Sequence, residues 1–84
     1  MFRLTELKRL AETYIAGTGI SAHALSVQII GRSNNVIIGR LLNGHEVSGR
    51  NLEVLSDFFA RQWPPDVAWP DGIARNGVAR EAAE

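Results

Sequence analysis

The stretch "NNVIIGRLLNG", residues 34–44, decides the fold of this chain. Ile38 and Leu41 lie three residues apart, so a helix places both on one side. Asn43-Gly44 is a typical helix ending, because glycine readily adopts the left-handed conformation found there. We therefore predict a short helix, capped by Ser33 or Asn34 and running to about Leu42. It buries Ile38, Leu41 and Leu42 and leaves the following residues to its outer side or margins: Asn34, Asn35, Val36, Ile37 and Arg40.

Helices are also predicted on both sides of this stretch. Apolar residues recur at three- and four-residue spacing from Leu4 to Ile15, and Gly17-Thr18-Gly19 ends that helix. Ser21 is a suitable N-cap for a helix from about Ala22 to Ile30, closed by Gly31. Ser48 is a suitable N-cap for a further helix, in which Leu52, Leu55 and Phe59 share one face. We expect that helix to end at Trp63, because Pro64-Pro65 follows. No segment alternates with period two, so we predict an all-α bundle of four to five helices.

The chain of 84 residues is long enough for one domain, which we place at residues 1–63. Residues 64–84 form a tail containing proline and tryptophan, with a weak helical pattern near 78–83. We expect Trp63 and Trp69 to anchor its first part by packing on the bundle. With no cysteine, neither disulfides nor thiolate metal sites can supplement a small core. Dimerisation is the simplest remaining support.

The charge of the chain is unevenly distributed. Nine Lys and Arg balance nine Asp and Glu, yet no acidic residue occurs between Glu12 and Glu46. His23, Arg32, Arg40 and His45 all fall within that window. A neutral total therefore hides a locally positive middle, as a polyanion partner requires. No apolar run approaches the ~20 residues of a membrane span, and we expect a cytoplasmic protein with no membrane partner.

The second and third predicted helices, joined by a tight turn of about four residues, make a helix-turn-helix pattern. One helix of such a pair fits the major groove of DNA while its neighbour braces it. Asparagine pairs with adenine, arginine with guanine, and an aliphatic side chain meets the thymine methyl group. Arg40 is the main candidate for base contact. Gly39 costs about 1 kcal/mol relative to alanine inside a helix, so a close approach of DNA or of the second helix is expected there.

The segment "SAHALSVQIIGRSNNVIIGRLLNGHEVSGRNLEVLSDFF", residues 21–59, resembles the helix-turn-helix core of the Cro/CI-type (XRE) regulators of bacteria and phages. The resemblance covers about half of the chain. It is carried by the aliphatic pair Ile38 and Leu41, by Asn43-Gly44, and by the Ser48-capped helix with Asn51-Leu52. One extra residue between Gly31 and Ile38 departs from the usual pattern. The closing "WPPDVAWPDGI" resembles the tails of short phage-like regulators.

The resemblance implies a lambda-repressor-like fold and a homodimer that binds a pseudo-palindromic operator in double-stranded DNA. It implies a transcriptional regulator, most simply a repressor, that associates with the nucleoid when bound. The implied base contacts are Asn34, Asn35, Val36 and Arg40. The implied phosphate contacts are His23, Arg32, Ser33, Asn43 and Arg50.

Simpler roles are open for several of these residues. Arg32 and Arg40 fit solvated surface charges, and Asn34 fits a turn or cap residue. A protein-interaction module of the same fold, such as an antitoxin-like or host-factor-binding subunit, is the alternative function. The neutral net charge of the chain and an apolar outer margin at Val36, Ile37 and Leu42 favour that alternative.

No pattern in the chain predicts an enzyme, a metal site or a cofactor. His23 and His45 lack the further ligands that a metal requires. "GTGISA", residues 17–22, follows a predicted helix, whereas a dinucleotide-binding motif follows a strand. No serine is placed with histidine and carboxylate as a nucleophile requires.

Overall fold

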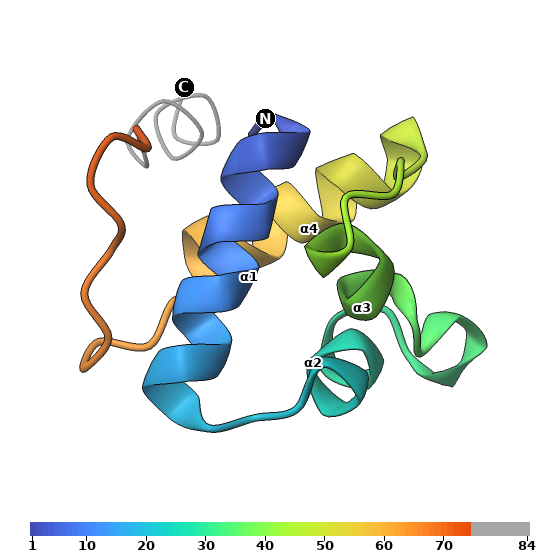
Figure 1. Cartoon of the computed structure of the whole chain (residues 1–84), viewed down its shortest axis with the longest axis horizontal. Coiled ribbons are helices and arrows are strands. Elements are labelled where there is room, and N and C mark those ends of the chain that lie inside the picture. Colours follow the sequence, from blue (N-terminus) through green and yellow to red (C-terminus); the bar gives the residue numbers. More distant parts are fainter. Residues whose placement is uncertain (75–84) are drawn as a thin grey trace.

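The computed structural model describes residues 1–74 and contains four α-helices (Figure 1). They are α1 (Leu4–Thr18), α2 (Ala22–Ile29), α3 (Ile37–Leu42) and α4 (Gly49–Arg61), with a 3₁₀ turn, η1 (Arg32–Asn34), between α2 and α3. These residues form no strand, which confirms the all-α bundle. None of these helices is both long and apolar enough to cross a membrane. The weak helical pattern predicted near 78–83 lies outside the described residues.

The predicted C-terminal end of α1 and the predicted starts of α2 and α4 are confirmed, whereas α4 ends at Arg61, two residues before the predicted end at Trp63. Gly19 follows α1 with φ of 77° and donates its N–H to the carbonyl of Ile15. The Ser21 Oγ accepts the N–H of Ala24 at 3.0 Å at the start of α2. The Ser48 Oγ accepts the N–H of Asn51 at 3.4 Å at the start of α4. Each of these ends is determined by residues adjacent to it in the sequence.

The prediction for the start of the third helix is wrong. The helix begins at Ile37, and neither Ser33 nor Asn34 caps it. The predicted tight turn is also wrong, since residues 30–36 separate α2 from α3 and include η1. Gly31 takes φ of 104°, which bends the chain out of α2, and its carbonyl accepts the N–H of Asn34. Serine and asparagine favour such turns over helix interiors, because their side chains compete for backbone hydrogen bonds.

A buried serine of α2 takes the place of the missing cap. Ser26 is fully buried; its hydroxyl donates to the carbonyl of Ala22 at 2.8 Å and accepts the N–H of Ile38 at 3.0 Å. That N–H belongs to the first turn of α3 and has no partner within the helix. One side chain therefore satisfies the start of α3 and holds it against α2.

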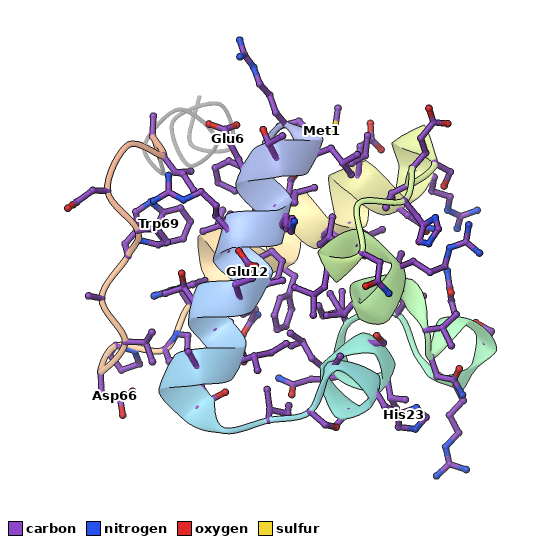
Figure 2. The ribbon with its side chains drawn as sticks, viewed as in Figure 1. Met1, Glu6, Glu12, His23, Asp66 and Trp69 are labelled. Atoms are coloured by element: carbon purple, nitrogen blue, oxygen red, sulfur yellow. The ribbon has the colours of Figure 1, made fainter. Side chains whose placement is uncertain are left out.

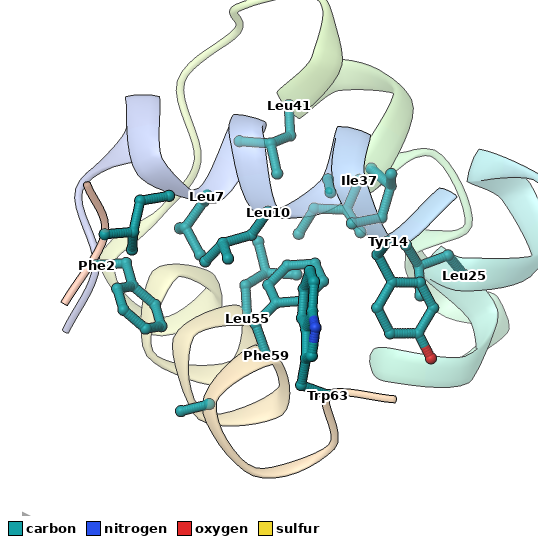
Figure 3. Packing of buried hydrophobic residues seen from close by; sticks show 14 residues of the cluster. Phe2, Leu7, Leu10, Tyr14, Leu25, Ile37, Leu41, Leu55, Phe59 and Trp63 are labelled. Atoms are coloured by element: carbon teal, nitrogen blue, oxygen red, sulfur yellow. The ribbon is translucent and has the colours of Figure 1, made fainter. Parts of the chain in front are cut away.

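The hydrophobic core lies between α1 and α4, and α3 reaches it with its inner side (Figure 3). The Tyr14 ring of α1 contacts Phe59 and Trp63 edge to face, with centroids 6.0 and 5.6 Å apart. Leu41 of α3 is fully buried in the same cluster. Since α3 packs on both α1 and α2, its position is set from two sides.

The first part of the tail is anchored as predicted. The indole Nε1 of Trp63 donates to the carbonyl of Val67, and that of Trp69 donates to the carbonyl of Ile73, each at 2.7 Å. The two rings meet with centroids 4.9 Å apart. "WPPDV" and "WPDGI" thus form the same local hydrogen bond twice. Their shared pattern is an internal repeat that we did not predict.

The tail runs along the side of α1 that faces away from α2 and α3 (Figure 1). Val67 packs against Gly17, where an added Cβ would come within 2.7 Å of the valine methyl groups. Trp69 lies against Phe2, with ring centroids 5.8 Å apart. Residues 64–74, the described part of the tail, therefore leave the outer side of α3 uncovered.

Replacing Ser26 by alanine is expected to lower the free energy of unfolding by about 1–3 kcal/mol, because the buried N–H of Ile38 loses its acceptor. Urea denaturation of both proteins measures this difference. Ser33→Ala, at an exposed serine, is the matched control and should change stability by less than about 0.5 kcal/mol. Equal stability of the two variants would contradict the role given to Ser26.

Candidate nucleic-acid interface

The two sides of α3 differ in burial. Ile38 and Leu41 are fully buried, which confirms their predicted position. Arg40 is exposed, and Val36, just before the helix, is 55% exposed. Ile37 is only 3% exposed, so its predicted place at the outer margin is wrong. It lies one turn before Leu41 and faces the core with it. Leu42 is half-buried.

The outer side of α3 and the first turn of α2 border a shallow hollow of about 340 Å³. We call this surface the α3 face. It brings together five of the predicted contact residues, which otherwise lie up to twenty positions apart in the sequence. Its lining residues are Ala22, His23, Asn35, Val36, Gly39, Arg40 and Asn43.

Arg32 extends the α3 face along α2. It lines an adjoining hollow with His23 and Asn35, two residues that also line the α3 face. Its side chain is exposed. The positive charge of Arg32 therefore borders the same surface as that of Arg40.

The other three predicted residues lie together on a neighbouring surface. Ser33, Asn34 and Arg50 line a separate hollow with Asn51 and Val54 of α4. Asn34 and Arg40 also border one small pocket of about 180 Å³, together with Glu46 and Asn51. The expectation that Asn34 projects beside Asn35 from one helix is wrong, because η1 ends at Asn34 and turns it toward α4.

Helix N-termini lie next to both groups. The N–H groups of Ala22 and His23 open α2, and those of Gly49 and Arg50 open α4; such groups have no acceptor within their own helix. Together with the helix dipole, they favour a bound anion. Ala22 lines the α3 face, and Arg50 lines the neighbouring surface.

The charges on these surfaces are free of ion pairs. Arg32, Arg40 and Arg50 are exposed, and within residues 1–74 the single ion pair joins Arg61 to Asp57 at 2.5 Å. In Figure 2, His23 lies beside α2, whereas the labelled acids Glu6, Glu12 and Asp66 lie over α1 and the tail. Glu46 is the acidic residue that borders these surfaces, in the small pocket that it shares with Arg40.

Ala22 and Asn51 line these surfaces and were not among the predicted contacts. The first residue after an N-cap has an exposed N–H, and that signal could have identified Ala22. Asn51 is brought beside Arg40 only by the packing of α4, which no local pattern indicates. Within the described residues, no three His, Cys, Asp or Glu side chains are grouped so that they could hold a metal ion.

Comparison of the chain with protein-family models, with curated proteins and with solved structures gives no match. The interpretation of the α3 face rests on its own geometry and charge.

A pair of neighbouring substitutions tests which side of this segment is buried. Ile37→Ala should lower the free energy of unfolding by about 2–5 kcal/mol, because it leaves a cavity in the core. Val36→Ala removes two methyl groups from an exposed side chain. It should change the free energy of unfolding by less than about 0.5 kcal/mol. Thermal or urea denaturation gives both values. A larger loss for Val36→Ala than for Ile37→Ala would reverse the assignment of the two sides.

Proposed function

We propose that this chain is a sequence-specific binder of double-stranded DNA, and that it acts as a small transcriptional repressor of the phage or prophage type. One observation carries the proposal. Asn35, Arg40 and Asn43 lie together on an uncovered face whose positive charges have no ion-pair partners. We place the protein in the cytoplasm, associated with the nucleoid.

The α3 face suits the major groove, which admits a single helix. Arg40 lines this face and would pair with the O6 and N7 acceptors of a guanine. Asn35 would pair with adenine, and Val36 would contact a thymine methyl group. Asn34 is assigned a base contact at the edge of the groove, since it borders the same pocket as Arg40.

Phosphate contacts are proposed on both flanks of the α3 face. His23 and Arg32 lie on the α2 side, where the first N–H groups of α2 also point outward. Ser33 and Arg50 lie on the α4 side. Asn43, exposed at the end of α3, would position the helix without selecting a base.

The proposed assembly is a two-fold symmetric dimer on a pseudo-palindromic operator. The protomer measures 32 × 28 × 20 Å. Successive major grooves on one side of DNA are about 34 Å apart. Two protomers side by side therefore match the spacing of two half-sites.

The alternative of a protein-interaction module has less support. It relied on the neutral net charge of the chain and on an apolar margin formed by Val36, Ile37 and Leu42. Ile37 is buried in the core and Leu42 is half-buried, which leaves Val36 as the one largely exposed member of the three. A single exposed valine is ordinary for a protein surface.

Selection from a pool of random duplexes tests the proposal. We expect one enriched sequence with two half-sites related by two-fold symmetry and centred about 10 base pairs apart. Affinity for it should fall steeply with added salt, because each neutralised phosphate releases counterions. A pool that shows no enrichment, with binding no tighter than to mixed-sequence DNA, would contradict sequence-specific binding.

Arg40→Ala should abolish the preference at one base pair of each half-site. The loss expected for a bidentate contact is about 1–3 kcal/mol, measured by titrating the selected duplex and its single-base variants. Arg61→Ala is the matched control. It removes the same charge from the C-terminal end of α4, far along the helix from its N-terminus. It should leave affinity unchanged. If Arg40→Ala retained both affinity and preference, the base contact assigned to Arg40 would be wrong.

A further inference from the structure

Gly39 stands in the middle of α3 without a structural reason for being glycine. It does not have a positive φ, so an L-residue fits its backbone. A Cβ built at this position meets no atom within 4 Å. Alanine would therefore fit and would form a better helix. Neither strain nor crowding within the protein accounts for the missing side chain.

The space over Gly39 is the centre of the α3 face. Val36 lies one turn before it and Asn43 one turn after it, so the three line one side of the helix axis. Ala22 of α2 closes the hollow from the other side. Val36, Gly39 and Ala22 thus give the hollow its small apolar groups, and Arg40 and Asn35 line it with polar groups.

This arrangement fits a small apolar group that is surrounded by hydrogen-bonding groups and negative charge. In the major groove, the thymine C5 methyl group is the one apolar group on a base edge, and the neighbouring base edges carry donors and acceptors. A phosphate beside the groove would meet the unpaired charge of Arg32. A Cβ at position 39 would occupy the place of that methyl group.

We propose that Gly39 determines sequence preference: the hollow formed by Gly39, Val36 and Ala22 receives the methyl group of one thymine per half-site. This inference rests on the proposed binding of double-stranded DNA. It names the base that the α3 face recognises through apolar contact. It also explains why an unfavourable residue stands inside a short helix.

The test uses the duplex selected by the unmodified protein. Each thymine is replaced in turn by deoxyuridine, which lacks only the methyl group, and affinities are measured for the unmodified protein and for Gly39→Ala. At one thymine of each half-site, the unmodified protein should lose about fourfold in affinity, as burial of one methyl group implies. Gly39→Ala should bind the thymine duplex about tenfold more weakly and no longer distinguish thymine from deoxyuridine there.

Thermal melting separates this effect from a folding defect. Gly39→Ala should raise the melting temperature by about 4 °C, because alanine favours the helix. Thr5→Ala, at an exposed position of α1, is the control for increased helix propensity and should leave DNA affinity unchanged.

The following results would overturn the inference. A lower melting temperature for Gly39→Ala would mean that the added methyl group clashes within the protein. Unchanged DNA affinity of that variant, or unchanged discrimination against deoxyuridine, would refute the thymine contact and leave DNA binding intact. Failure of the unmodified protein to select any duplex would overturn the proposed function and this inference together.

Discussion

The hydroxyl of Ser26 joins α2 to the first turn of α3. It lies between two helices at full burial and bonds to the backbone of both. Ser56 has a similar place in α4, where its buried Oγ accepts the N–H of Phe2. In this small protein, two buried serines supply acceptors for backbone N–H groups that would otherwise be costly to bury. Ser26, on α2, also determines where α3 starts.

The position of α3 decides which residues remain available for binding. Burial of Ile37, Ile38 and Leu41 against α1 and α2 leaves Val36, Gly39 and Arg40 on the outside. The tail packs along the opposite side of α1 (Figure 1). Val67 against Gly17 and Trp69 against Phe2 hold residues 64–74 there. The fold therefore separates the surface that stabilises the protein from the surface that we propose for DNA.

Much of the fold could be predicted because its signals are local. The caps at Ser21 and Ser48 and the helix end at Gly19 follow from neighbouring residues. The start of α3 could not be predicted, since its acceptor, Ser26, lies twelve positions from Ile38. The burial of Ile37 was missed because α3 packs on two helices, which widens its buried side beyond a single stripe. The separation of Asn34 from Asn35 follows from η1, which depends on the conformation of Gly31.

The central claim is that the α3 face, and not α1 or the tail, contacts DNA. NMR titration of the isotope-labelled protein with a mixed-sequence duplex tests it most directly. We expect the largest changes in amide chemical shift in the first turn of α2, from residue 32 to residue 43, and at the start of α4. Changes concentrated on α1 and residues 64–74, with α3 unaffected, would contradict it.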